Sequence, residues 1–147
     1  MIKPDLSSMT FYLGTWTCHQ KLRGGDRPDT TTYTMAYDGK WVAAHDVAPP
    51  FDKYRTKTII SDTWYTYNPL TKTWASLSVD NFGGYGVSTS PGWVGSKMIW
   101  TDTISANGTL GVGTIMKVSD TKITYTNVSH NKMGKINPVD RGVCTKS

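Results

Sequence analysis

Apolar and polar residues alternate with a period of two along most of the chain. In the segment 30–37, Tyr33, Met35 and Tyr37 fall on one face and Thr32 and Thr34 on the other, a pattern typical of a half-buried β-strand. Turn signals such as Asp38-Gly39 separate segments of this kind. The pattern predicts ten strands, at about 11–22, 30–37, 40–48, 56–67, 74–81, 85–89, 97–105, 109–118, 121–130 and 142–146.

The connections between these segments are short, and a polar loop at 23–29 joins the first two. No helical pattern of 10–15 residues interrupts them. Regularly spaced short strands are typical of antiparallel sandwiches and barrels. Because the order of hairpins contains no long crossover, we expect an all-β fold, a single antiparallel up-and-down barrel that occupies residues 1–147.

Composition agrees with this fold class. All 11 acidic residues are Asp, and the chain contains 6 Trp and 8 Tyr; it therefore lacks Glu, a good helix former, and is rich in strand formers. With 37% hydrophobic residues the chain can bury a core. No apolar run is long enough to span a membrane. The net charge of +5 comes from scattered lysines and arginines, so we expect no nucleic-acid partner.

The two cysteines, Cys18 and Cys144, lie near opposite ends of the chain. Closing a barrel puts the first and last strands side by side, which favours a disulfide between them, with two free thiols as the alternative. Residues 1–10 contain no apolar core of a signal peptide. The compartment stays open, with a periplasmic or secreted location after removal of a signal among the alternatives.

Two segments resemble the calycin superfamily, which includes lipocalins, fatty-acid-binding proteins and nitrobindin-like barrels. Residues 13–18, Leu-Gly-Thr-Trp-Thr-Cys, are similar to its Gly-x-Trp opening. Residues 65–74, Tyr-Thr-Tyr-Asn-Pro-Leu-Thr-Lys-Thr-Trp, followed by Val79-Asp80-Asn81 and Gly83-Gly84, are similar to a stretch in uncharacterised bacterial lipocalin-like proteins.

The resemblance implies a lipocalin-like barrel in which Trp16 packs at a closed base, and it carries no settled activity. Nitrobindin-like members bind haem through a His close to the C-terminus. Here His130 precedes the final loop and the last predicted strand has no His. We therefore expect neither haem nor another cofactor.

Few residues offer catalytic chemistry. The chain has no phosphate-binding loop and no nucleophile or metalloprotease motif, and the spacing of its three His residues predicts no metal site. On the segment 40–48, alternation places His45 with Trp41 and Ala43 on the more apolar face. This predicts an imidazole in the lumen that orients a ligand or acts as a general base. The alternative is a core His that bonds to a neighbour.

Asp102 shares the more apolar face of its strand with Met98 and Trp100. A carboxylate there must be paired or have a raised pKa, so Asp102 is a candidate catalytic group or a structural anchor. The aromatic residues exceed the needs of a small core and predict a pocket for a flat ligand, a packed core being the alternative. The candidate ligand-binding residues are Trp16, Tyr33, Trp41, His45, Tyr65, Trp74, Trp100 and Tyr125.

Three functions follow from these observations. The first is the binding of a small hydrophobic or aromatic molecule in the barrel cavity. The second is a cofactor-free hydrolase, isomerase or lyase that uses His45 and Asp102 in the same cavity for acid–base catalysis. The third is a structural or interaction domain with a filled barrel. The sequence does not decide the oligomeric state.

Overall fold

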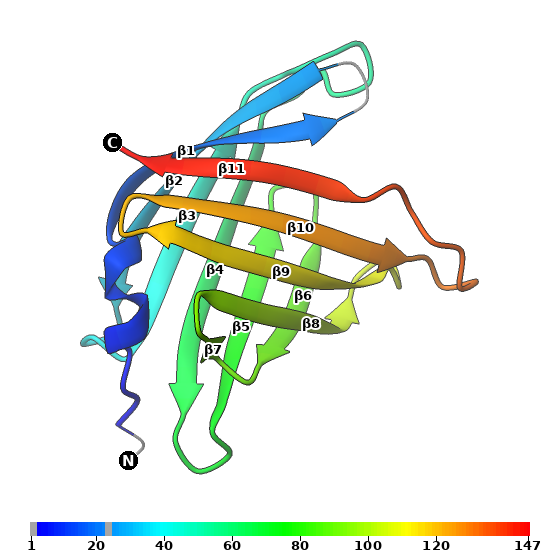
Figure 1. Cartoon of the computed structure of the whole chain (residues 1–147). Helices are drawn as coiled ribbons and strands as arrows, with labels where there is room; N and C mark the ends of the chain where they lie inside the picture. Colours follow the sequence, from blue (N-terminus) through cyan, green and yellow to red (C-terminus); the bar gives the residue numbers. More distant parts are fainter. Residues whose placement is uncertain (1–2, 23–24) are drawn as a thin grey trace.

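Ten antiparallel strands close into a barrel in the computed structural model, which describes residues 3–22 and 25–147 (Figure 1). Pairing of β6 with β8 closes the ring, and the two-residue β7 (Trp93–Val94) lies beside β8 outside it. The predicted all-β barrel is therefore confirmed. The ring consists of β1 (Gly14–Leu22), β2 (Gly25–Ala36), β3 (Trp41–Ala48), β4 (Ile59–Asn68), β5 (Thr73–Asp80), β6 (Tyr85–Ser90), β8 (Lys97–Ser105), β9 (Leu110–Ser119), β10 (Lys122–His130) and β11 (Asp140–Lys146).

The second strand begins earlier than predicted. Residues 25–29 belong to β2 instead of a loop, whereas residues 23–24 lie outside the described part of the chain. Pro28 is tolerated because it lies beyond Thr30, where pairing with β3 begins, so this part of β2 pairs only with β1. A strand with one free edge is the usual setting for proline in a sheet. The correction matters because it brings Arg27 and Asp29 into the barrel wall.

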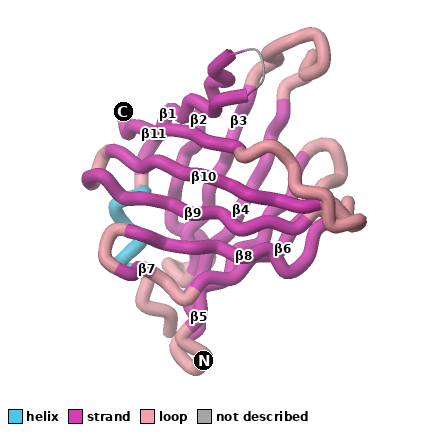
Figure 2. The backbone as a smooth tube through the Cα atoms, turned by 45° about the vertical axis from the view of Figure 1, so that its right-hand side comes forward, coloured by secondary structure: helices cyan, strands magenta, loops and turns pink. Residues whose placement is uncertain are grey.

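A short 3-10 helix, η1 (Ser7–Tyr12), precedes β1, so the strand predicted from residue 11 is wrong for its first three residues. The helix lies at one end of the strands (Figure 2). Its side chains Met9 and Tyr12 are each only 2% exposed and join Trp16 in the core. This end of the barrel is the base. No helix among the described residues has the length and apolarity to cross a membrane.

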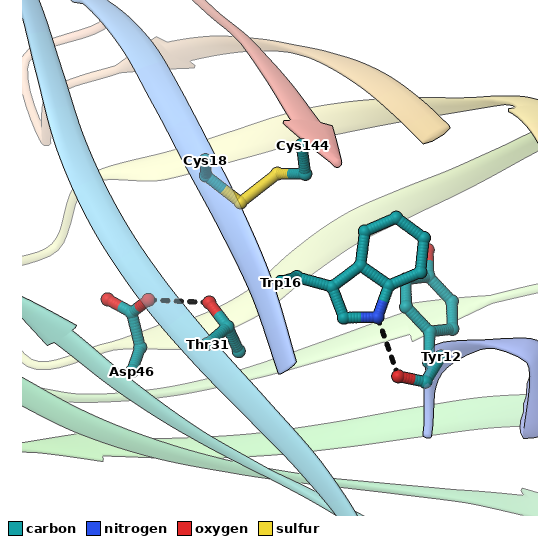
Figure 3. Close-up of a disulfide and its surroundings, with 6 residues drawn as sticks. All are labelled: Tyr12, Trp16, Cys18, Thr31, Asp46 and Cys144. Atoms are coloured by element: carbon teal, nitrogen blue, oxygen red, sulfur yellow. Dashed lines mark hydrogen bonds between the residues drawn. A yellow bond between two sulfur atoms is a disulfide. The ribbon is translucent and has the colours of Figure 1, made fainter. Parts of the chain in front are cut away.

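The strands that begin and end the barrel are linked covalently. β1 pairs with β11, and the register places Cys18 opposite Cys144. Their sulfurs form a disulfide, which confirms the predicted bridge (Figure 3). Both cysteines are buried, so the bridge forms part of the inner wall.

Candidate ligand site in the barrel lumen

The predicted orientation of β3 is wrong. Val42 and Ala44 are 0% and 5% exposed and face inward, whereas His45 is exposed. Trp41 also faces outward, where it forms a shallow apolar shelf with Tyr37, Trp64 and Leu77. On the outer surface, apolar side chains of β3 lie beside apolar side chains of the neighbouring strands, which shields them in part from water. The more apolar face of β3 is therefore its outer face.

His45 and Asp102 therefore lie on different sides of the wall. The Nδ1 atom of His45 is 2.7 Å from Oδ1 of Asp62, its register partner on β4, and both side chains are about half exposed. Asp102 faces inward from β8, in the mouth of the barrel opposite the base. The structure does not assemble the predicted pair of a general base and a carboxylate in one cavity.

Four of the predicted aromatic residues meet in a cavity of about 210 Å³ inside the barrel: Tyr33, Tyr65, Trp100 and Tyr125. Two others are packed at the base. Trp16 is 1% exposed and its indole nitrogen donates to the carbonyl oxygen of Tyr12 at 2.7 Å (Figure 3). Trp74 is 3% exposed and packs against Tyr67.

The cavity has a polar wall and an apolar wall. Strands β2, β3 and β4 contribute the polar side, with tyrosine hydroxyls and carboxylates. The opposite side, from β8, β9 and β10, consists mainly of aliphatic and aromatic carbon and includes Tyr125. The apolar wall contains Trp100 of β8, Ile115 of β9 and Ile123 of β10, with Met9 of η1 below. The Cys18–Cys144 bridge lies beside the polar wall, because Cys18 is the register partner of Asp29.

Two carboxylates line the polar wall, Asp29 of β2 and Asp46 of β3. Thr31 donates its hydroxyl hydrogen to Oδ1 of Asp46 at 2.6 Å (Figure 3). Burial, followed by the nearby charge of Asp46, raises the pKa of Asp29 to about 7. Burial also raises the pKa of Asp46. These carboxylates thus lie in a poorly solvated place that favours a bound positive charge or a proton.

Several polar atoms of this region are buried without a hydrogen-bond partner. They include the hydroxyl oxygen of Tyr12 and Oδ1 of Asp29, both from residues that line the cavity. Buried polar groups in native proteins usually have a partner, and an unpaired one costs about 1–3 kcal/mol. Burial raises the pKa of Tyr12 and of Tyr33 beside it, so both hydroxyls stay neutral. Both residues belong to the lining of the cavity, so a small shift of either side chain would bring these atoms to a bound ligand.

Sequence reasoning missed both carboxylates. Asp29 fell in the predicted loop, and Asp46 was assigned to the outer face because His45 was assigned to the inner one. The period-two series Asp29, Thr31, Tyr33 could have revealed the first of them, since all three share one face of an extended β2.

A second hollow of about 470 Å³ lies at the mouth, between β4, β5, β6 and β8. Its carboxylates are already bonded within the fold. Asp102 accepts from the Ser88 hydroxyl at 2.6 Å and from the amide of Gly111 at 2.9 Å. Asp80 accepts from the amides of Phe82 and Gly84 and thereby holds the turn after β5. This hollow is larger than the deep cavity, but its walls are mainly hydroxyls and glycines and offer little apolar surface to a ligand.

Candidate ligands for a metal or haem are scattered over the described part of the chain. In residues 3–22 and 25–147, no three His, Cys or Asp side chains gather as a metal site would require. The three His residues are exposed, and none lines the deep cavity. The residues present do not fit a haem site with a histidine ligand.

Fold and site together define a β-barrel with a small amphipathic cavity. No protein-family profile and no curated protein matches the chain. Among solved structures, Rv2717c from M. tuberculosis is similar over 100% of this chain and 99% of its own, with a TM-score of 0.73 at 8% identity. At that identity the likeness shows the fold alone. A protein of unknown function from the DUF3598 family of Nostoc punctiforme aligns over 99% of this chain and 100% of its own at 8% identity, but a TM-score of 0.28 carries no argument.

Proposed function

We propose that this protein is a calycin-type barrel that binds a small aromatic molecule in the deep cavity. The observation that carries the proposal is the cavity of about 210 Å³ whose lining combines apolar side chains with Tyr12 and Asp29, each of which has a buried polar atom without a hydrogen-bond partner. A core built only for stability would fill this space and pair these atoms.

The size of the cavity limits the ligand. Drug-sized molecules occupy sites of roughly 300–1,000 Å³, so about 210 Å³ suits a compound with one ring or two fused rings. Burial of an aromatic ring removes about 150 Å² of surface from water, worth roughly 4 kcal/mol. Hydrogen bonds to the polar wall add to this, and we expect dissociation constants in the micromolar range, about 8 kcal/mol of binding free energy.

Tryptophan fluorescence tests the proposal, because Trp100 lines the cavity. Titration with one-ring compounds such as 2-phenylethanol and 2-phenylethylamine should quench the emission in a saturable manner. The variant Ile115→Phe fills the cavity from β9 and should abolish this quenching. Its matched control is Ile99→Phe on the exposed face of β8, which should bind as the wild type does.

A circular dichroism spectrum would show whether Ile115→Phe still folds. If overpacking prevents folding, Ile123→Phe provides a second way to fill the same cavity from β10. Unchanged quenching in a folded, filled variant would refute the proposal, as would the absence of binding by every compound of the panel.

We do not propose the enzyme alternative, because the imidazole of His45, on which it depends, is on the outer surface. Both functions were expected to use an aromatic pocket with tyrosine hydroxyls, and such a pocket can bind a ligand without any catalytic group.

A further inference from the structure

The polar wall of the deep cavity has an unusual balance of charge. Asp29 and Asp46 both line it, and no cationic side chain does. Arg27 is the nearest cation, and its charge lowers the pKa of both Asp29 and Asp46. Within the described residues, however, no nitrogen of Arg27 comes within the 4.0 Å of an ion pair with either carboxylate, and its Nε atom is buried without a partner.

The carboxylates of the cavity also receive few hydrogen bonds from the protein. Asp46 receives one hydrogen bond, from Thr31, whereas Oδ1 of Asp29 is buried and receives none. A third group, independent of the acids, faces the same space. The Tyr12 side chain is 98% buried (2% exposed), lines the cavity, and its hydroxyl has no partner in the described structure. A ligand with several N–H donors would satisfy these acceptors together.

Aromatic faces add to the preference for a cation. Tyr33, Tyr65, Tyr125 and Trp100 surround the cavity, and rings of this kind attract an ammonium group held within about 6 Å. The opposite wall, with Ile115 and Ile123, suits the apolar body of the same molecule.

We infer that the ligand is a protonated aromatic amine, with its ring against the apolar wall and its ammonium group between Asp29 and Asp46. This inference rests on the proposed function and adds the chemical class of the ligand. The ammonium group adds a positive charge in direct contact with the carboxylates, which Arg27 does not provide, and donates hydrogen bonds to their oxygens. A neutral or anionic aromatic compound of the same size would leave the carboxylates with the charge of Arg27 alone and without an ion pair, which is costly in a poorly solvated site.

Isothermal titration calorimetry with 2-phenylethylamine and 2-phenylethanol tests the inference, because the two compounds differ only in the ammonium or hydroxyl group. At pH 8 we expect the amine to bind at least about tenfold more tightly, since a hydrogen bond to a charged group is worth about 1.5–3 kcal/mol. Asp29→Asn and Asp46→Asn should each reduce this ratio, and the double variant should bring it close to one. Asp62→Asn, on the outer face, is the matched control and should keep the full ratio.

The pH dependence supplies a second readout. The affinity for the amine should rise between pH 5.5 and 8 as Asp29 ionises, because its pKa is raised to about 7, whereas the affinity for the alcohol should not. Asp29→Asn should flatten the profile of the amine. The charged and titratable groups that interact with Asp29 are Arg27 and Tyr33 on β2, Asp46 on β3 and Tyr125 on β10.

The outcomes separate the two proposals. If the alcohol binds as tightly as the amine, or if the amine preference survives in the folded double variant, the inference about the ligand is overturned while the proposed function stands. If neither compound nor the wider aromatic panel binds, both fail.

Discussion

The deep cavity and the hollow at the mouth belong to the same barrel, yet Asp29 in the first and Asp102 in the second differ in their hydrogen bonds. At the mouth, Asp102 accepts two hydrogen bonds, from Ser88 and Gly111, and so ties β8 to β6 and β9. In the deep cavity one oxygen of Asp29 is buried and accepts none. A bonded carboxylate holds strands together, whereas an unpaired buried oxygen costs stability until a ligand donates to it. The difference points to the smaller hollow as the site.

The largest expected effect concerns the disulfide in the wall of the cavity. The bridge joins residues separated by 126 positions, and in the chain-entropy model a loop of that length contributes about 4–5 kcal/mol to stability. The double variant Cys18→Ala and Cys144→Ala should therefore lose about 3–5 kcal/mol of unfolding free energy, measured by urea denaturation. A loss below about 1 kcal/mol would show that ring closure by hydrogen bonds alone holds the first and last strands.

The next largest effect is a difference in stability between variants of Asp102 and of Asp29. Asp102→Ala leaves the Ser88 hydroxyl and the Gly111 amide without their acceptor, and we expect a loss of about 2–3 kcal/mol. Asp29→Asn removes a buried charge and should cost little or increase stability at pH 8. Urea titrations of both variants measure these changes in unfolding free energy. An equal loss in the two variants would contradict the proposed difference between Asp102 and Asp29.

A third prediction uses pH. Because folding raises the pKa of Asp29 from 3.8 to about 7, the folded protein binds more protons than the unfolded chain between these values, and this group makes stability fall as pH rises from about 4 to about 7. The carboxyl is only partly buried, so we discount the full shift and expect about 1–2 kcal/mol. Asp29→Asn should lack this part of the slope, seen by comparing melting curves of the two proteins at pH 4, 6 and 8. Parallel profiles would contradict it.

The smallest effect is expected on the outer surface. His45→Ala breaks an exposed contact with Asp62, and exposed pairs of this kind are worth about 0–1 kcal/mol. Ligand affinity should stay unchanged in the fluorescence titration. A loss of binding in His45→Ala would indicate that the imidazole contacts the ligand, which would contradict the outward orientation of His45 on β3.

The sequence predicts the barrel well and the site only in part. Strand spacing, turn signals and the two cysteines are local or topological signals, and they suffice for the ring of strands and for the bridge. The lining of the lumen depends on which face of each strand is inside, and on β3 this choice fails. Trp41 has partners in Trp64 and Leu77 across the outer surface, so hydrophobicity alone cannot identify the inner face.

The error on β3 had a chemical consequence. It put His45 into the cavity and Asp46 outside it, and the loop prediction removed Asp29 from the barrel altogether. The aromatic residues were a sounder guide, since Tyr33, Tyr65, Trp100 and Tyr125 all line the cavity. Which buried oxygens lack a hydrogen-bond partner depends on the contacts between side chains of different strands. These contacts exist only in the folded chain and cannot be predicted from the spacing of residues.

A crystal structure of the protein grown with 2-phenylethylamine tests the central claim most directly. The account predicts electron density for the ligand in the deep cavity, with the ring beside Trp100 and the ammonium group within hydrogen-bond distance of Asp29. An empty cavity in crystals with ligand bound only at the mouth, or on the outer shelf of Trp41 and Trp64, would contradict it.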